Sequence, residues 1–503
     1  MQTKLADFIK DTPQGREAEA ILRKCVHCGF CTATCPTYQL LGDELDGPRG
    51  RIYLMKQVLE GEAATAKTQL HLDRCLTCRA CETTCPSGVH YSRLLDIGRA
   101  IVAQQVPRSG MEKMQRRALA AVIPRPALFN PLLAIGRIAR NLLPRVLDDV
   151  VPDQPVRARP WPVGGHARRM LVLEGCVQPA LSPATNAAAA RVLDKLGISL
   201  VRAPNAGCCG ALAFHLDEQD RALDAMRHNI DAWWPYVEQG AEALIFTASG
   251  CGVIITDYGH LLAHDTAYAE RAKRISALAC DLGSAIEKQK NQLKQLLRDN
   301  RPSGKFVFHP PCTLQHGLKL KGRTEALLAE LGFDLAPVAD AHLCCGSAGT
   351  YSILQPEISA QLKNNKIKAL TAASPAQILT ANIGCQTHLQ SATALPVRHW
   401  IEAVDDLLSR SIPLSLHHSS SCTFADTGVP SAATVESRTK NNSGTALVLF
   451  VTEAYSPLQF IQHRRARHGR CCIRHCLRSG RQRAAETRQI RPAAAPHQRR
   501  SRL

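Results

Sequence analysis

The sequence predicts an α+β multidomain protein that has an α-helical N-terminal domain, two duplicated α/β domains with parallel sheets and a disordered tail. Three observations predict it. Two runs of closely spaced cysteines lie before residue 90, a second cysteine pattern occurs twice between residues 170 and 390, and the composition changes after residue 410. The expected boundaries are 1–100 for the N-terminal domain, 101–165 for a helical linker, 166–290 and 300–410 for the two copies, and 411–503 for the tail.

Both N-terminal runs follow the spacing C-x2-C-x2-C-x3-C-P, and the second run begins fifty residues after the first. Bacterial ferredoxins use this spacing for [4Fe–4S] clusters, whereas zinc sites and disulfide frameworks use others. In two-cluster ferredoxins the fourth cysteine of each run binds the other cluster. The sequence therefore predicts a ferredoxin-type domain with two [4Fe–4S] clusters and a role in electron transfer. The expected ligands are Cys25, Cys28, Cys31 and Cys85 for cluster 1, and Cys75, Cys78, Cys81 and Cys35 for cluster 2.

Four charged or titratable residues lie close to these cysteines. A Gly-Pro-Arg turn with Arg49 and Arg51 leads into an apolar helical stretch at 52–59. We expect both arginines on the surface, with a position facing the clusters or a partner as the alternative. We expect His27 and Arg79 to face solvent or to donate hydrogen bonds around the clusters.

The central region contains an internal repeat. In each copy one cysteine is followed, after 31 intervening residues, by Cys-Cys-Gly and later by a fourth cysteine. Apolar runs end shortly before each cysteine group, so a parallel sheet would gather the four thiols at the carboxyl ends of its strands. A further iron–sulfur cluster, zinc, a thiol-redox pair and a partner contact all remain open. The two candidate metal sites are Cys176, Cys208, Cys209 and Cys251, and Cys312, Cys344, Cys345 and Cys385.

Secondary structure can be predicted within each copy. Gly210 and Gly346 are expected to allow a tight turn beside the paired cysteines. We expect His309 and His388 to be structural histidines, with metal ligation as the alternative. The expected strands are 170–173, 198–201, 243–246, 306–308, 333–338 and 377–379, and the expected helices include 187–196, 217–237 and 399–408.

Length, cysteine usage and charge narrow the class of protein. The 503 residues allow two to four domains, and the 21 cysteines follow an N-terminus without an apolar leader, which favours reduced thiols. No stretch reaches eighteen uninterrupted apolar residues. The net charge of +19 is concentrated after residue 410, where 15 Lys and Arg face 4 Asp and Glu. Bulk charge therefore does not indicate a nucleic-acid partner, and we expect none.

The tail differs from the rest of the chain. It is first Ser/His-rich, then Arg-rich, and has no periodicity, so we predict a disordered or non-native extension without a function. A zinc knuckle is the alternative. Its residues would be Cys471, Cys472, Cys476, His468 and His475.

Two ferredoxin-type runs, a helical linker and two Cys-Cys-Gly domains together resemble the glycolate oxidase iron–sulfur subunit family over about 1–410, above all in segments 24–31 and 73–81. The resemblance implies a complex whose flavin-bearing subunits oxidise glycolate to glyoxylate, with D-lactate as a second candidate. No G-x-G-x-x-G fingerprint follows a strand, so we expect no catalytic residue in this chain. The resemblance also implies a quinone or other membrane acceptor, and a cytoplasmic location peripheral to the inner face of the membrane.

Three alternatives stay open. The chain could serve a related complex, such as anaerobic glycerol-3-phosphate dehydrogenase or lactate utilisation. It could be a thiol-redox enzyme similar to heterodisulfide reductase. In that branch the last cysteine group of each Cys-Cys-Gly domain is C-x-x-C. Here Ala248 and Asn382 replace the first cysteine of that pair, which argues against the unusual cluster of that branch. The last alternative is a redox-sensing nucleic-acid binder that uses the basic tail.

Overall fold

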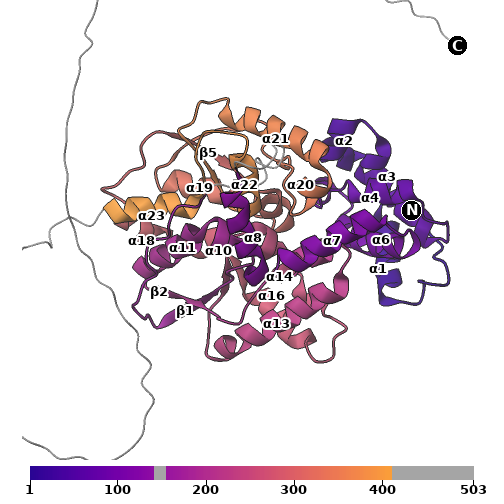
Figure 1. The fold of residues 1–503 in the computed structure, drawn as a ribbon, viewed down its shortest axis with the longest axis horizontal. Coiled ribbons are helices and arrows are strands. Elements are labelled where there is room, and N and C mark those ends of the chain that lie inside the picture. Colours follow the sequence, from indigo (N-terminus) through magenta and orange to yellow (C-terminus); the bar gives the residue numbers. More distant parts are fainter. Residues whose placement is uncertain (141–153, 411–503) are drawn as a thin grey trace, which may run out of the picture. The chain divides into compact units, whose positions relative to one another are not determined.

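A computed structural model describes residues 1–140 and 154–410, which belong to one structural unit (Figure 1). The predicted tail with its candidate zinc knuckle, and residues 141–153 of the predicted linker, lie outside the described residues. The fold class is as predicted, with a helical N-terminal region followed by two parallel sheets. The domain boundaries stay a prediction.

The N-terminal region consists of short helices around the two cysteine runs. Two helix starts are capped by threonines: the Thr12 hydroxyl accepts a hydrogen bond from the Gly15 amide at 3.0 Å, and Thr65 forms a reciprocal pair with Thr68. The helical stretch expected at 52–59 forms the larger part of α3. The elements are α1 (Pro13–Lys24), η1 (Phe30–Thr34), α2 (Pro36–Leu41), η2 (Glu44–Asp46), α3 (Pro48–Leu59), α4 (Ala66–Asp73), α5 (Ala80–Thr84) and α6 (Tyr91–Gln105).

In the described part of the predicted linker, α7 (Gly110–Val122) and α8 (Pro126–Ile138) follow α6. None of the helices in the described ranges is long and apolar enough to cross a bilayer alone, although α7 and α8 would meet that test as a pair bent by 107°. Trp161 attaches the end of the linker to the first sheet, because its indole N–H donates to the Leu200 carbonyl at 3.2 Å.

The first copy of the repeat is an alternation of strands and helices. Its strands are β1 (Arg168–Val172), β2 (Ile198–Arg202), β3 (Leu244–Phe246) and β4 (Ala279–Asp281). Its helices are α10 (Gln178–Leu181), α11 (Pro183–Lys195), α12 (Ala211–His215), α13 (Gln219–Glu238), α14 (Ser249–Thr256), α15 (Tyr258–Leu261), α16 (Ala269–Leu278), α17 (Leu282–Glu287) and α18 (Lys290–Leu296).

The second copy repeats this plan. Its strands are β5 (Lys305–His309), β6 (Asp334–Ala336), β7 (Gln377–Thr380) and β8 (Val397–His399). Its helical elements are η4 (Thr313–Gly317), α19 (Arg323–Glu330), α20 (Tyr351–Leu354), α21 (Pro356–Thr371), α22 (Ile383–Gln390) and α23 (Trp400–Arg410).

The two sheets have the same topology. Their strand orders are β2-β1-β3-β4 and β6-β5-β7-β8, and every pair is parallel. The six expected strands are all present, but β4 and β8 were not predicted. Each has only three residues, Ala-Cys-Asp and Val-Arg-His, and neither is an apolar run that a sequence pattern could distinguish from a loop.

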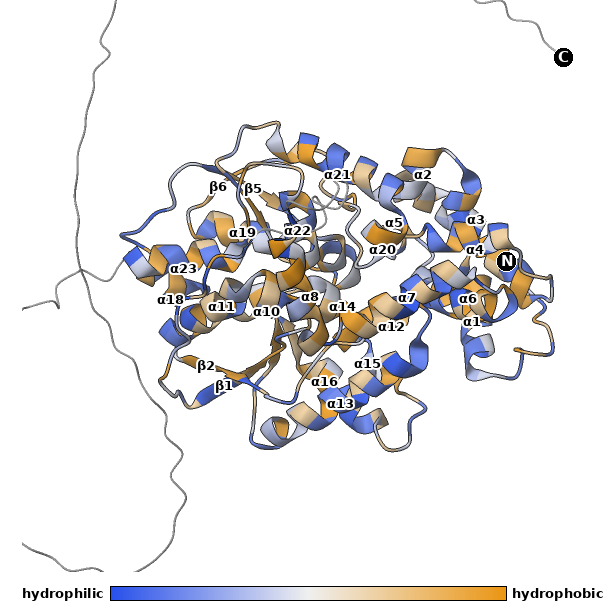
Figure 2. Ribbon diagram, viewed as in Figure 1, coloured by the Kyte–Doolittle hydropathy of each residue, from blue (hydrophilic) through white to orange (hydrophobic). Residues whose placement is uncertain are grey.

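One hydrophobic core spans both copies, with Ile198 and Val172 from the first copy and Phe306 and Trp400 from the second. The hydropathy colouring of Figure 2 shows hydrophobic residues along strands of both copies. Polar side chains reinforce this contact. The Thr185 hydroxyl donates to Glu402 at 2.6 Å, and the His399 ring donates to the Thr247 carbonyl at 2.9 Å. The two sheets therefore hold their cysteine-bearing strand ends within one shared scaffold.

Candidate iron–sulfur and metal sites

The two N-terminal cysteine loops share an unusual backbone path. His27 and Gly29 have φ of 56° and 84°, and Thr77 and Arg79, fifty residues on, have φ of 51° and 59°. Non-glycine residues adopt this left-handed region at an energetic cost, which is tolerated where function requires a special loop shape. The conformation curls each loop so that its cysteines face a common centre.

The fourth cysteine of each run lies beside the other run. Burial raises the pKa of Cys31 to about 11, and the charges of Cys25, Cys28 and Cys85 contribute to the shift. Burial also raises the pKa of Cys81, together with the charges of Cys78, Cys75 and Cys35. One cavity is lined by the first of the expected ligand sets and a second cavity by the other, with Cys81 bordering both. Four sulfurs around each cavity are the donor set that a [4Fe–4S] cluster needs, so these residues fit the two clusters.

The expectation of a surface position is wrong for Arg51, which is 1% exposed. Its guanidinium donates to the His71 carbonyl at 2.7 Å and to Thr37 at 3.1 Å, and it pairs with the fully buried Asp46. A buried carboxylate requires such partners because an unpaired charge is costly in the protein interior. The alternative, a position facing the clusters, is met, since Cys75 and Cys35 are close enough to raise the pKa of Arg51 against the effect of burial.

Three other N-terminal residues have different outcomes. Arg49 stays partly exposed, as expected, and pairs with Glu44 at 2.7 Å. His27 is half-buried and faces the Tyr53 ring edge-on. Arg79 does not face solvent, because it pairs with Asp257 of the first copy at 2.8 Å. Its role is to join the N-terminal region to that copy.

The first copy gathers its four cysteines as the strand ends predict. Hydrogen bonds from Cys176 and Cys209 lower the pKa of Cys208 well below its usual value. Hydrogen bonds to Cys208 and Cys251, together with burial, raise the pKa of Cys209. Gly210 has φ of 88°, and a Cβ there would lie 2.9 Å from the Ala222 carbonyl oxygen, so the tight turn requires glycine.

The second copy also gathers its cysteines. The sulfurs of Cys312 and Cys344 are 3.8 Å apart, and Cys345 hydrogen bonds with both Cys344 and Cys385. Asn382, which stands where a fifth cysteine would be, donates to the Cys385 sulfur at 3.5 Å and accepts from the Gly250 amide of the first copy at 3.0 Å. The missing cysteine is thus replaced by an amide that links the two copies.

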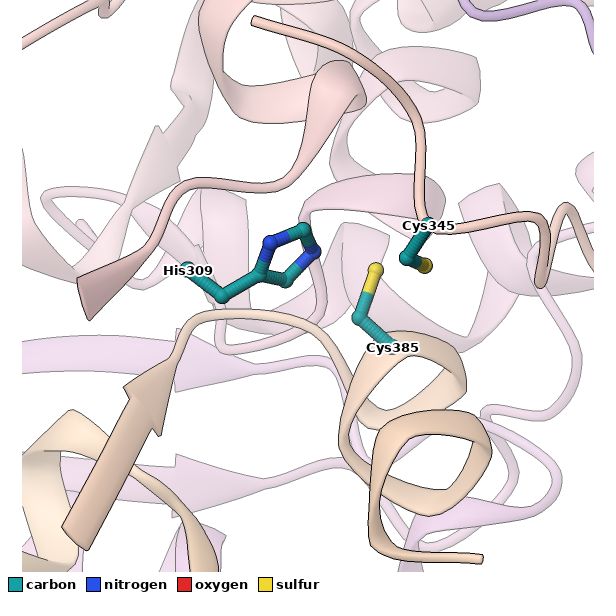
Figure 3. A group of neighbouring side chains, drawn as sticks. All are labelled: His309, Cys345 and Cys385. Atoms are coloured by element: carbon teal, nitrogen blue, oxygen red, sulfur yellow. The ribbon is translucent and has the colours of Figure 1, made fainter. Parts of the chain in front are cut away.

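The two histidines of the second copy differ. His388 is hydrogen bonded to Ser359 at 3.3 Å, in keeping with a structural histidine. His309 differs, because both of its ring nitrogens are buried without a hydrogen-bond partner among the residues that the structure describes. The ring lies beside Cys345 and Cys385, and the donor atoms of the three residues are all within 4.8 Å of one another (Figure 3).

The second copy lies directly against the second ferredoxin-type run. Burial and the charge of Cys312 raise the pKa of Cys78. Tyr351 donates to the Arg74 carbonyl at 3.0 Å. A buried apolar cluster joins the two parts (Leu76, Cys344, Tyr351, Ile358 and Leu362). No sequence signal indicated this proximity, because the partners are more than 230 residues apart.

Two family comparisons match this organisation. Residues 21–89 match the 4Fe–4S dicluster domain family, and residues 170–256 and 306–390 each match the cysteine-rich domain family. The chain is also 55% identical over 410 residues to the glycolate oxidase iron–sulfur subunit of Escherichia coli K12, which covers 82% of this chain and all of that protein.

The chain belongs to the glycolate oxidase iron–sulfur subunit family.

Two further proteins are similar to this chain at lower identity. The probable glycolate oxidase iron–sulfur subunit of Bacillus subtilis 168 is 32% identical over 399 residues, which is 74% of this chain and 88% of that protein. Lactate utilization protein A of Anoxybacillus flavithermus is 27% identical over 199 residues, or 39% of this chain and 80% of that protein. In this chain the dicluster region and both cysteine-rich copies occur in one polypeptide.

Proposed function

We propose that this chain relays electrons within a glycolate-oxidising complex, from a flavin-bearing partner subunit to a quinone or another membrane acceptor. The observation on which the proposal depends is the grouping of eight cysteines into two sets of four, each around its own cavity. Bound [4Fe–4S] clusters would supply one-electron acceptors and donors, which link a two-electron flavin to a distant carrier. Oxidation of glycolate, with D-lactate as a second candidate, takes place on the partner.

The ligand sets that we propose are exchanged between the runs. Cys85 completes the first set and Cys35 completes the second, because each lies among the three thiols of the other run. The first set is the outer one, since Cys28 is exposed and is flanked by Val26 and Phe30, which are 68% and 60% exposed. This apolar rim is where we place the contact with the electron-donating partner.

The second set is the inner one, and polar groups surround it. The Tyr91 hydroxyl donates to the Cys75 sulfur at 3.6 Å, and Arg99 donates to the Cys75 carbonyl at 2.9 Å. Together with the buried Arg51 these groups favour the more reduced, more negative state of anything that the thiols hold. The second set should therefore receive electrons from the first.

The membrane side of the proposal is supported by α7 and α8. Leu128, Leu132 and Ile135 follow one face of α8 and are 45%, 53% and 60% exposed, and Met111 and Met114 on α7 are 71% and 60% exposed. Apolar helix faces of this kind bind at the lipid–water interface. We infer peripheral contact with the cytoplasmic face of the membrane. Co-flotation of the assembled complex with anionic vesicles should be lost in Leu132→Glu/Ile135→Glu and kept in the matched exposed-site variant Leu70→Glu.

The ligand exchange can be tested by comparing single variants of the full chain, purified without oxygen. The wild type should contain about eight irons per chain, for two four-iron clusters. Cys85→Ser should give the same electron paramagnetic resonance spectrum as Cys25→Ser, and Cys35→Ser the same as Cys75→Ser. Cys280→Ser, a half-buried thiol outside the proposed sets, is the control and should keep all the iron. A Cys85→Ser spectrum identical to that of Cys75→Ser would refute the exchange.

The relay itself requires the partner subunits. Glycolate should reduce the iron–sulfur signals of the assembled complex, whereas the isolated chain should neither oxidise glycolate nor reduce disulfides. An iron-free wild-type chain would end the proposal. Disulfide reduction by the isolated chain with a supplied reductant would favour the thiol-redox alternative. Reduction of the complex by D-lactate but not by glycolate would identify D-lactate as the substrate.

A further inference from the structure

The two copies differ at one position of their cysteine sites. Three residues before the first cysteine, the second copy has His309 at the end of β5, whereas the first copy has Leu173 just after β1. Leu173 is 3% exposed and packs in the core of its copy with Phe246. The duplicated fold is therefore satisfied by an apolar side chain here, and packing alone does not require a histidine.

His309 is unusual because nothing among the described residues satisfies its ring. The residue is 1% exposed, and both ring nitrogens lack a hydrogen-bond partner there, although its carbonyl accepts from Thr380 at 3.1 Å. A buried polar atom that lacks a partner is costly, because it has lost its hydrogen bonds to water and gained none in the protein. Burial, with a smaller contribution from Lys366, lowers the pKa of His309. Metal ions bind the unprotonated nitrogen of an imidazole, and a bound ion would give one of these two ring nitrogens the partner that it lacks.

The neighbours of the ring are two thiols. The donor atoms of His309, Cys345 and Cys385 all lie within 4.8 Å of one another, and Figure 3 shows the three side chains converging from a strand end, a loop and the start of α22. Bonds of about 2.0–2.3 Å to one tetrahedral ion place such donors about 3.5–4 Å apart. The ligands of a four-iron cluster bind four different irons and stand farther from one another. The spacing favours a single ion.

We propose that the second copy binds one zinc-class divalent ion through His309, Cys345 and Cys385, and that the first copy does not. Cys344, which hydrogen bonds with Cys345, is a further donor for the fourth position. Binding replaces the protons of the thiols that ligate, and these protons pass to solvent. This site is independent of the proposed electron relay, because zinc undergoes no redox change.

Two groups around the site are arranged to support thiolates. Lys366 is 3% exposed, donates to the Asp340 carbonyl at 2.7 Å and lies within electrostatic reach of Cys345 and Cys344. The Asn382 amide donates to the Cys385 sulfur at 3.5 Å. A buried cation and a sulfur-directed N–H both stabilise negative sulfur, as hydrogen bonds around metal ligands commonly do.

The experiment uses the full chain, purified without oxygen and dialysed against a chelator, with metals counted per chain. We expect about one zinc in addition to the iron, and after growth with Co²⁺ a sulfur-to-cobalt charge-transfer band. His309→Leu, which introduces the residue that the first copy has at this position, should lose the zinc and keep the iron. His309→Cys should restore the zinc, because it returns a donor. The matched control is Cys251→Ser, the counterpart of Cys385 in the first copy, and it should keep the zinc.

Three results would overturn the site. The wild type could retain iron but no zinc, His309→Leu could retain the zinc, or Cys251→Ser could lose it as completely as Cys385→Ser. About twelve irons in the wild type, reduced to about eight in Cys385→Ser, would also overturn it in favour of a cluster. Failure of the relay is distinct, since it would appear as loss of the iron of the N-terminal sets with the zinc still bound.

Discussion

The two cysteine-rich copies have the same strand order and the same cysteine spacing, yet they contact the N-terminal region by different chemistry. The first copy uses charged side chains: Asp257 pairs with Arg79 and Arg93 of that region, and Asp217 pairs at 2.9 Å with Arg108 of the linker, which also pairs with Asp73. The second copy uses apolar side chains and sulfur around Leu76. The two copies have therefore kept the same sheet, whereas residues outside the strands make different contacts with the rest of the chain.

This difference has a consequence for the inner iron–sulfur set. The second copy packs its apolar cluster against Cys78, and it places Cys312 close by. The first copy is attached through groups that are about one-fifth exposed, such as Arg79 and Asp257 at 19% and 20%. We expect the first attachment to respond to salt and the second to be largely independent of it.

The largest expected effect comes from the apolar contact. Leu76 is 4% exposed, so Leu76→Ala should leave a cavity in the buried cluster. We expect this cavity to lower the free energy of unfolding of the iron-loaded chain by about 2–5 kcal/mol. The measurement is urea unfolding followed by cluster absorbance, at low and high salt. Leu70→Ala, at a leucine that is 41% exposed, is the control and should change the free energy by less than about 0.5 kcal/mol. A loss that disappears in high salt would contradict an apolar contact.

A smaller and salt-dependent effect is expected at the charged contact. Asp257→Asn removes the partner of Arg79 and Arg93, and should cost about 1–3 kcal/mol at low ionic strength. The cost should shrink as salt screens the charges. The same urea titration measures it, with Asp231→Asn as the control, because its pair with Arg271 is exposed and should be worth less than about 1 kcal/mol. Equal costs for both variants would show that the Asp257 ion pairs stabilise the chain no more than an exposed ion pair does.

The smallest net effect in the wild type is expected at the ends of the two edge strands, β4 and β8, where two pH dependences oppose each other. Burial raises the pKa of Asp281 to about 6, and burial lowers the pKa of His399 to about 4. Between pH 4 and 6 the folded chain keeps the Asp281 proton that the unfolded chain has lost, so this group makes stability fall as pH rises. Over the same range the unfolded chain holds a His399 proton that the folded chain lacks, so this group makes stability rise with pH.

The two contributions oppose each other in the wild type, and single variants should separate them. Relative to wild type, Asp281→Asn should gain stability with rising pH, and His399→Gln should lose it, each by up to about 1.4 kcal/mol per pH unit between pH 4 and 6. The urea midpoint by tryptophan fluorescence is the measurement, since all four tryptophans lie between residues 161 and 400. Parallel pH profiles for both variants would show that these groups do not titrate as the structure indicates.

Local spacing was sufficient to predict much of this molecule. The two cysteine runs indicated their cofactor because the ligands of one loop are close in sequence, and the copies were recognisable because Cys176 and Cys312 begin the same pattern. The central strands were predictable because they are short apolar runs. β4 (Ala-Cys-Asp) and β8 (Val-Arg-His) were missed because neither of these short strands is an apolar run.

Single side chains were harder to predict. Arg51 is charged and follows a turn, which is typical of a surface, but the buried Asp46 determines its position. Arg79 faces a residue 178 positions away. His309 resembles any histidine near a cysteine until the structure shows that its ring has neither solvent nor a partner among the described residues.

The sequence by itself determined the kind of protein: the cysteine spacing, the duplicated pattern and the strand–helix alternation are local and are repeated along the chain. Only the tertiary structure decided which copy lies against the inner cysteine set, which charges are buried, and that a histidine joins the thiols of one copy alone. The physical reason is that burial and charge pairing depend on residues that are distant in sequence, and a periodic pattern contains no information about which distant residues meet.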